Sequence, residues 1–412
     1  MAKCEFVNTG AYLQSQDCAH DQVINGLFDF YTKTLLPIEQ AISFEQFQST
    51  PITEGEMRSP PMVLLVGPYS VGKTSFIRYL IGKDIPGQNI GPEPTTDRFV
   101  AVMHGAEERV VPGNTLAVAP LSPFEGLQVF GNGFLTRFEG AVVNSDLLKA
   151  VTLIDTPGIL SGAKHRDRTY DPDVVMKWFA ERCDMIILLV DVHKLDFSDE
   201  LAGVVQILHT HADKVRVALN KSDAVAQQQL MRVYGAVMWS LAKVLGTPEV
   251  CRVYLGSFWE NPPSNADTSK LLRAEMEDMI RDLCMLPRQS AVRKVNEIVK
   301  RSRKVRLLAC LLDYLRSEMP KLGSADKKKT KLLADIDGVC ATVCKKYQLS
   351  TGDFPSADVF LDAAARMDFS KFPALKGKRL QHGKLLEELA NHLSSTIPGL
   401  LELLPATGQR AI

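Results

Sequence analysis

Residues with phosphate-binding chemistry stand at a fixed spacing early in the chain, where Gly67, Gly72, Lys73 and Thr74 form the pattern Gly-x-x-x-x-Gly-Lys-Thr. Glycines let backbone N–H groups wrap phosphate oxygens, the lysine reaches the β- and γ-phosphates, and the threonine hydroxyl holds Mg²⁺. The alternative is a chance match in a glycine-rich turn. The flanking elements decide between these two interpretations.

The motif needs a strand before it and a helix after it. Residues 62–66 form a short, continuously apolar run, which is typical of a buried parallel strand, and residues 75–81 are expected to form a helix. Phosphate would then lie at a helix N-terminus, where unpaired N–H groups and the helix dipole favour negative charge. We therefore predict a nucleoside triphosphate site.

Further elements of a GTPase-like site follow in order along the chain. Residues 151–155 are predicted as a second buried strand that ends in Asp155-x-x-Gly158, which places a carboxylate near Mg²⁺ and a backbone N–H near the γ-phosphate. Residues 185–190 and 215–219 are two more apolar strands. The last runs into Asn-Lys-x-Asp at 220–223, a pattern that reads the base and supports the phosphate loop.

The segment 91–97 carries two hydroxyl groups, on Thr95 and Thr96. We expect one of them to complete the Mg²⁺ shell when triphosphate is bound. The alternative is an ordinary turn, because Ser, Thr and Pro are common in turns.

Four runs resemble the EH-domain-containing (EHD) ATPases of the dynamin superfamily: GPEPTTDRFVAVMHG at 91–105, DTPGILSG at 155–162, WFAERCDMIILL at 178–189 and LMRVYGAVMWSL at 230–241. The resemblance extends from about residue 20 to 400. It implies an α/β fold, a P-loop dynamin-like G domain with a mostly parallel sheet flanked by helices, together with an α-helical domain. It also implies homodimers and higher oligomers that remodel or tubulate membranes in endocytic recycling.

The motifs and the resemblance together assign roles to individual residues. Ser70, Lys73 and Thr96 are the expected catalytic residues, and Thr74, Thr96 and Asp155 the expected Mg²⁺ ligands. Trp239 matches the family's dimer interface, with a packed core indole as the alternative. The expected nucleotide contacts are Gly67, Tyr69, Ser70, Val71, Gly72, Lys73, Thr74, Ser75, Asp155, Gly158, Asn220, Lys221, Asp223 and Trp259.

Two arguments disagree about the base. Asn-Lys-x-Asp alone favours guanine, because its carboxylate accepts the N1 and N2 protons that adenine lacks, whereas the resemblance implies ATP. We expect ATP, with GTP as the alternative. Ile159 follows Gly158 where small GTPases carry a water-positioning glutamine, so intrinsic hydrolysis should be slow. Pro68 replaces the family's usual glutamine and removes a backbone N–H, which puts the turnover rate in doubt.

Composition agrees with a globular protein of two domains. The chain has 412 residues, 45% of them hydrophobic, and a formal net charge of zero, so no bulk charge favours nucleic acid. The eight cysteines lack metal-ligand spacing and are expected to be reduced, cytosolic thiols. No run approaches the roughly 18 apolar residues that span a bilayer. We therefore expect a cytoplasmic protein, peripheral on the cytosolic face of endosomal or plasma membranes.

We predict four segments. Residues 1–58 pack on the helical domain, 59–285 form the nucleotide-binding domain, 286–400 form a helical domain with a membrane-binding tip, and 401–412 are a tail. Residues 292–319 fit one long amphipathic helix, and residues 21–36 a shorter one.

Basic residues concentrate in one part of the predicted helical domain. Residues 288–346 hold sixteen Lys and Arg against six Asp and Glu. Lys327, Lys328, Lys329 and Lys331 are expected in a turn between two helices, where they would bind anionic phospholipid. The alternative is a solvated basic loop.

The family's C-terminal EH domain has no room after Ile412, and Gln128-Val129-Phe130 stands where relatives carry Asn-Pro-Phe. Either this sequence is part of a longer protein, or we expect a short family member that attaches through lipid alone. The fragment 335–338 lacks the downstream glutamate of a calcium loop, so no calcium binding is expected. The alternative function is a slow, nucleotide-switched scaffold that recruits partners.

Overall fold

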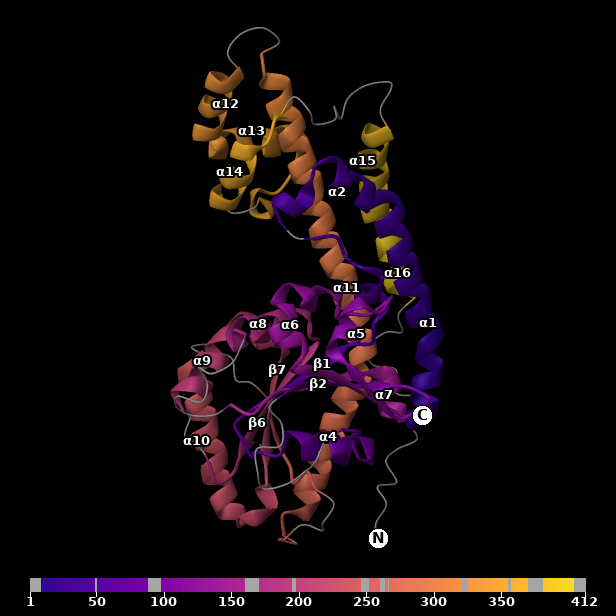
Figure 1. The fold of residues 1–412 in the computed structure, drawn as a ribbon, viewed down its shortest axis with the longest axis vertical. Helices are drawn as coiled ribbons and strands as arrows, with labels where there is room; N and C mark the ends of the chain where they lie inside the picture. Colours follow the sequence, from indigo (N-terminus) through magenta and orange to yellow (C-terminus); the bar gives the residue numbers. More distant parts are fainter. Residues whose placement is uncertain are drawn as a thin grey trace. The chain divides into compact units, whose positions relative to one another are not determined.

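The structure is a computed structural model that describes residues 9–48, 50–87, 98–159, 170–194, 198–245, 252–259, 264–265, 267–320, 325–354, 357–369 and 381–403 (Figure 1). Within these residues the chain forms two compact units. The nucleotide unit consists of residues 58–290 with 9–15, and the helical unit of residues 16–57 with 291–403.

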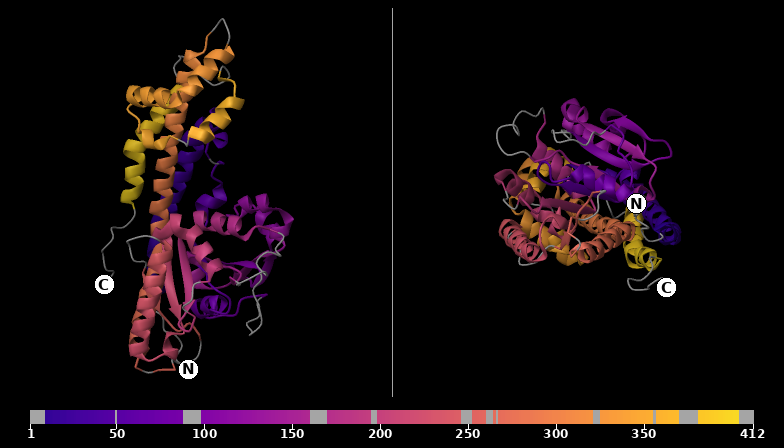
Figure 2. Two further views of the ribbon diagram at one scale, coloured as in Figure 1. Left: turned by 90° about the vertical axis from the view of Figure 1, so that its left-hand side faces the viewer. Right: turned by 90° about the horizontal axis from the view of Figure 1, so that it is seen from below.

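The nucleotide unit is built on one eight-stranded sheet in the order β3-β4-β2-β5-β1-β6-β7-β8. Figure 2 shows the chain in two further views. The run β5-β1-β6-β7-β8 is parallel, as is the β2–β4 pair, whereas β2 pairs antiparallel with β5 and β3 with β4. The mostly parallel sheet predicted from the sequence is therefore confirmed. The strands are β1 Met62–Val66, β2 Phe99–His104, β3 Arg109–Pro112, β4 Phe138–Val143, β5 Thr152–Asp155, β6 Met185–Asp191, β7 Val215–Asn220 and β8 Val253–Leu255.

Helices cover both faces of this sheet, which is why its central strands are apolar without alternation. Leu64 of β1 belongs to a core with residues of α5 (Gly113–Val118), η3 (Glu125–Phe130), α6 (Gly131–Leu135), α8 (Pro172–Arg182), α9 (Asp199–Leu208) and α10 (Gln227–Leu245). Val63 and Leu65 of β1 belong to the opposite core, with residues of α4 (Lys73–Ile81), α7 (Asp146–Ala150) and the first half of α11 (Ser269–Glu318).

The predicted strand at 62–66 matches β1, and the other three predicted strands differ from β5, β6 and β7 by a single terminal residue. β6 and β7 each continue one residue beyond the apolar run, into Asp191 and Asn220. Helix α4 begins at Lys73, two residues before the predicted start at Ser75. The reason is Gly72, whose φ of 94° turns the loop directly into the helix.

The helical unit has no sheet among its described residues. The second half of α11 packs with the chain's early helices around one core. The predicted helix at 292–319 is the second half of α11, which runs through Pro287 without ending. The remaining elements are α1 Thr9–Phe30, η1 Tyr31–Leu35, α2 Leu36–Ala41, η2 Phe44–Gln46, α3 Glu54–Arg58, α12 Ala325–Ala334, α13 Ile336–Tyr347, η7 Thr351–Asp353, α14 Ala357–Arg366, α15 Gln381–Asn391, η9 His392–Thr396 and α16 Ile397–Glu402.

A buried polar network joins α2 and α11 within the helical unit. Arg301 donates to both carboxylate oxygens of Glu39, at 2.5 and 2.9 Å, and to the Thr50 carbonyl at 2.8 Å. The Tyr31 hydroxyl donates to the same carboxylate at 3.0 Å and accepts from the Ile52 N–H at 2.9 Å. Burial of charge is tolerated here because every charged group in the network is paired.

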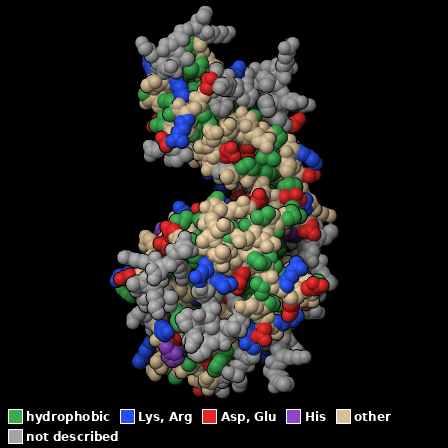
Figure 3. Space-filling model, viewed as in Figure 1, with side chains coloured by type: hydrophobic (Ala, Val, Ile, Leu, Met, Phe, Trp, Pro, Cys, Tyr) green, Lys and Arg blue, Asp and Glu red, His purple; other side chains and the backbone are tan. Residues whose placement is uncertain are grey.

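Two surface properties agree with the composition. The face seen in Figure 3 carries acidic and basic side chains interspersed, as the formal net charge of zero suggests. Among the described helices, none combines the length and the hydropathy required to cross a membrane.

Candidate nucleotide-binding site

The candidate site lies where four neighbouring parallel strands end. Because β5, β1, β6 and β7 are adjacent and parallel, their carboxyl ends meet at one edge of the sheet. That edge is where open α/β sheets bind ligands. It brings together the phosphate loop after β1 with Asp155, Asp191 and Asn220, the final residues of β5, β6 and β7.

Lys73 is folded back against the phosphate loop. Its Nζ donates to the Gly67 carbonyl at 3.0 Å and to the Pro68 carbonyl at 3.2 Å, and only 6% of the residue is exposed. Burial lowers the pKa of Lys73 to about 8, while the nearby Asp155 carboxylate opposes that shift. A phosphate group is anionic and would therefore accept a stronger hydrogen bond from the Lys73 ammonium than the two neutral carbonyls do.

Two residues of this loop have left-handed backbone conformations: Gly72 at φ 94° and Ser70 at φ 63°. A Cβ on Gly72 would lie 2.7 Å from Nδ2 of Asn220, so the position requires glycine for space as well as for conformation. Ser70 adopts the same region despite its side chain, which is uncommon outside glycine, Asn and Asp.

Thr74 and Asp155 form a paired oxygen site. The Thr74 hydroxyl donates to Oδ2 of Asp155 at 2.7 Å, and Asp155 is fully buried. Burial raises the pKa of Asp155, against the opposing effects of Lys73 and Thr74. Its Oδ1 is buried without a hydrogen-bond partner in the structure. A buried, unpaired carboxylate oxygen beside a hydroxyl fits Mg²⁺, which prefers hard oxygen ligands.

The turn after β5 is hydrogen-bonded to the phosphate loop. The Ile159 N–H donates to the Gly67 carbonyl at 3.2 Å, and the Tyr69 N–H donates to the Ile159 carbonyl at 3.1 Å. A Cβ on Gly158 would lie 2.9 Å from the Tyr69 Cα, so this close approach needs glycine. The pairing uses groups on either side of Pro68, so the missing Pro68 N–H removes neither bond.

The side-chain amide of Asn220 is hydrogen-bonded to backbone groups of the phosphate loop, of the turn after β7 and of the segment after β8. Its Nδ2 donates to the Val71 carbonyl at 2.8 Å. Its Oδ1 accepts from the N–H groups of Lys221 at 2.8 Å and Phe258 at 3.1 Å. The expected support of the phosphate loop by this motif therefore has a definite geometry.

The carboxylate of Asp223 is already engaged. Its Oδ2 accepts from the Ser264 N–H at 2.9 Å. Burial raises the pKa of Asp223, but hydrogen bonds from Ser257 and Ser264 outweigh it and hold the pKa below its ordinary value. Ser222 is turned away from the site, since its hydroxyl donates to the Leu219 carbonyl at 2.7 Å. Trp259, directly after Phe258, is 47% exposed.

Comparison with known proteins identifies the family. A sequence model of the Dynamin family matches residues 63–222, and one described as Domain of unknown function (DUF5600) matches residues 289–401. The chain is 50% identical over 359 residues to EH domain-containing protein 1 of Homo sapiens, covering 87% of this chain and 67% of that protein. The chain belongs to the EH domain-containing protein family.

A second relative in this family, EH domain-containing protein 3 of Homo sapiens, is 49% identical over 360 residues, with the same two shares. A solved structure of an oligomerised bacterial dynamin pair has a TM-score of 0.44 and 13% identity, over 84% of this chain and 54% of that chain. The family expected from the four sequence runs is thus confirmed, as is the dynamin-like G domain.

Trp239 of this EHD protein lies on α10 and is 76% exposed. The alternative of a packed core indole is therefore wrong. Met231, on the same helix, is 72% exposed, so α10 presents large apolar side chains to solvent.

The lysine cluster lies on helix α12, not in a turn between helices as expected. Helix α12 begins at Ala325, before the first lysine of the cluster, so all four lysines are part of the helix. Lys329 donates to the carbonyls of Ala365 at 2.8 Å and Met367 at 2.6 Å, at the end of α14, which makes it a helix-terminating contact. Lys328 lies 3.6 Å from Glu318, and Lys331 is exposed.

Some expected site residues lie outside the described residues: Thr95, Thr96 and Asp97 of the predicted switch loop, residues 160–162, and the side chain of Lys327. The other expected nucleotide contacts lie on the phosphate loop and the first turn of α4, at or just after the ends of β5 and β7, or, for Trp259, in the segment that follows β8.

Sequence reasoning missed three residues at this site. Asp191 pairs with Lys221, Thr156 donates from its hydroxyl to the Leu65 carbonyl at 2.7 Å, and Ser264 binds Asp223. A signal existed only for Asp191, a carboxylate directly after an apolar strand.

Proposed function

We propose that this EHD protein hydrolyses ATP in preference to GTP, with Mg²⁺, and that its slow turnover rises when it assembles on anionic membranes. Family membership supplies the coarser statement, that the protein is a membrane-remodelling, dynamin-like nucleoside triphosphatase. The arrangement of Lys73, Thr74 and Asp155 carries the hydrolase proposal, because it joins a phosphate-binding ammonium to an oxygen site for Mg²⁺.

Each residue has a role in this proposal. Lys73 binds the β- and γ-phosphates, and Thr74, Asp155 and Thr96 hold Mg²⁺. When bound, Mg²⁺ would neutralise charge on the phosphates. Ser70 and Thr96 orient the attacking water, a weaker arrangement than the glutamine of small GTPases, which is why turnover is slow.

The preference for ATP rests on Asp223. Recognition of guanine by this motif requires a carboxylate that accepts two protons from the base. Here the Ser264 N–H already occupies Oδ2 at 2.9 Å, and hydroxyl groups of Ser257 and Ser264 also hydrogen-bond the carboxylate. Displacing these donors has a free-energy cost that adenine, which makes no such demand, avoids. Trp259 provides an exposed ring for stacking on the base.

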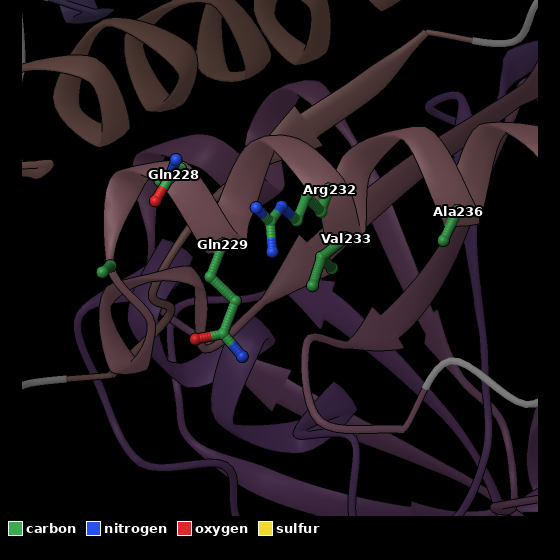
Figure 4. Close-up of a pocket in the computed structure, with 6 residues that line it drawn as sticks. Gln228, Gln229, Arg232, Val233 and Ala236 are labelled. Carbon is green, nitrogen blue, oxygen red and sulfur yellow. The ribbon is translucent and has the colours of Figure 1, made fainter.

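Dimerisation is proposed through α10. Trp239 is an exposed aromatic residue of the type that dominates interface energetics. One to three turns earlier on the same helix, Gln228, Gln229, Arg232, Val233 and Ala236 line a shallow pocket into which a partner could insert (Figure 4). Two nucleotide units joined here would form the assembled state that raises turnover.

Membrane attachment is proposed through Lys327, Lys328 and Lys331 of α12. Each basic residue near an anionic surface contributes about 1 kcal/mol, and assembly multiplies the effect. Lys329 supports the fold of this region through its two carbonyl contacts. The site of action would be the cytosolic face of endosomal or plasma membranes. The alternative, a nucleotide-switched scaffold, has no observation in its favour.

The test of base preference uses the Ser264 contact. We would measure dissociation constants for ATP and GTP with the wild-type protein and with Ser264→Pro, which removes the N–H that occupies Asp223. Ser264→Ala, which keeps that N–H, is the matched control. We expect the wild type to bind ATP more tightly than GTP. In Ser264→Pro we expect the affinity for GTP to rise, so that the difference between the two dissociation constants becomes smaller. A wild-type preference for GTP would contradict the proposal.

A further inference from the structure

Asp191, the last residue of β6, has a buried carboxylate, and each of its two oxygens accepts a hydrogen bond. Its side chain is 4% exposed. Oδ1 accepts from the His193 N–H at 2.9 Å, and Oδ2 accepts from Nζ of Lys221 at 2.6 Å. Sheet register explains the meeting, because Asp191 of β6 is directly opposite Asn220 of β7, and Lys221 follows.

The Lys221 ammonium makes a second contact, to the phosphate loop. It donates to the Ser70 carbonyl at 3.3 Å. Asn220 donates to the next carbonyl, that of Val71, at 2.8 Å. Two consecutive carbonyls of the loop are therefore held from the end of β7.

Holding a carbonyl also fixes an N–H group, because the peptide unit is planar and trans, so its C=O and N–H point in opposite directions. The Ser70 carbonyl shares a peptide with the Val71 N–H, and the Val71 carbonyl with the Gly72 N–H. With both carbonyls turned toward β7, both N–H groups turn away from it. Ser70 meanwhile has φ 63°, a conformation that L side chains rarely adopt and that needs such support.

We propose that Asp191 is a positioning residue for nucleotide binding, which orients the Lys221 ammonium against the Ser70 carbonyl and so aims the Val71 N–H at the phosphates. The inference rests on the proposed nucleotide site and adds to it a residue outside its sequence motifs. In this proposal Asp191 acts through Lys221 and makes no contact of its own with phosphate or base.

The proposal predicts a specific pattern of effects. Because Asp191 acts on the phosphate loop, its loss weakens ADP, ATP and GTP by the same factor. A role in base recognition would change the ATP to GTP ratio instead. A purely structural role would lower the melting temperature of the nucleotide-free protein without changing the affinity of the folded protein.

The experiment compares Asp191→Asn with Asp184→Asn. Asp184 directly precedes β6, at its opposite end, and accepts from the Met62 N–H at 2.8 Å, which an amide oxygen can also do. We would measure dissociation constants for ADP, ATP and GTP and the melting temperature without nucleotide. We expect Asp191→Asn to weaken all three nucleotides about tenfold, with Asp184→Asn unchanged. Unchanged affinities in Asp191→Asn, or a changed ATP to GTP ratio, would overturn the proposal.

Lys221→Gln provides a second route if Asp191→Asn folds poorly. If the two residues act as one unit, Lys221→Gln weakens the three nucleotides by the same factor, and the double variant is no weaker than either single variant. Additive losses would overturn the proposal. Absence of binding in the wild type would instead refute the nucleotide site itself.

Discussion

Two lysines, the buried Lys73 of the nucleotide unit and the half-buried Lys294 of the helical unit, share a lowered pKa but differ in what surrounds them. Lys73 of the nucleotide unit donates to the carbonyls of Gly67 and Pro68, and Lys294 of the helical unit donates to the Met57 carbonyl at 2.9 Å. Burial lowers the pKa of each to about 8. The residues around them differ. Lys73 is near a buried carboxylate with an unpaired oxygen and directly follows a loop in which Ser70 and Gly72 have left-handed conformations, whereas Lys294 lies within the long helix α11.

A lysine with a lowered pKa therefore does not by itself mark a ligand site. At the sheet edge, polar groups from four strands converge and leave acceptor capacity unused. In the helical unit, Arg301 and Tyr31 both donate to Glu39, so the charges of this network are paired with each other. The first arrangement is suited to binding, and the second to holding helices together.

The largest effect should come from breaking the buried network. Arg301→Ala leaves Glu39 as an unpaired buried carboxylate, so we expect it to lower the free energy of unfolding of the helical unit by about 3–5 kcal/mol in chemical denaturation. The matched control is Arg303→Ala, whose exposed pair with Asp353 at 3.0 Å should be worth about 1 kcal/mol or less. Similar losses in both variants would contradict the contrast.

Removing Lys73, the proposed phosphate-binding lysine, should affect nucleotide affinity instead of stability. We expect Lys73→Ala to weaken ATP at least about 100-fold, or about 2.7 kcal/mol, by calorimetry. Lys83 lies just beyond α4, and its Nζ is 3.4 Å from Oε1 of Glu108. Lys83→Ala removes a side chain of the same length and charge as Lys73, and we expect it to leave ATP affinity unchanged. Retained binding in Lys73→Ala would refute the assigned site.

The smallest effect is a pH dependence at Lys294. Its folded-state pKa of about 8 lies below its ordinary value of 10.5, so between these values the unfolded chain binds more protons. Stability contributed by this group therefore rises with pH over that interval, by on the order of 1–2 kcal/mol. Unfolding free energies of wild type and Lys294→Met, measured at pH 7.5 and 10, should show a larger rise in the wild type, because Lys73 contributes its own rise to both proteins. Lys300→Met, on an exposed position of α11, serves as control and should keep the rise.

The sequence predicted the sheet strands well because buried parallel strands are short, apolar and directly followed by the site motifs. It could not predict the Asp191–Lys221 pair, because that contact depends on the register between β6 and β7. It placed the lysines of α12 in a turn, and it could not predict the contacts of Lys329, because these depend on where α14 ends in space. Motifs reveal residues that act on a ligand, whereas contacts between distant segments require the fold.

The most direct test of the account is nucleotide turnover with ATP and with GTP, each with anionic or neutral liposomes, in the wild type and in a variant with Lys328→Glu and Lys331→Glu. We predict slow ATP hydrolysis that rises only with anionic liposomes and loses that rise in the variant. Preferential GTP hydrolysis, or no stimulation although nucleotide binds tightly, would contradict it.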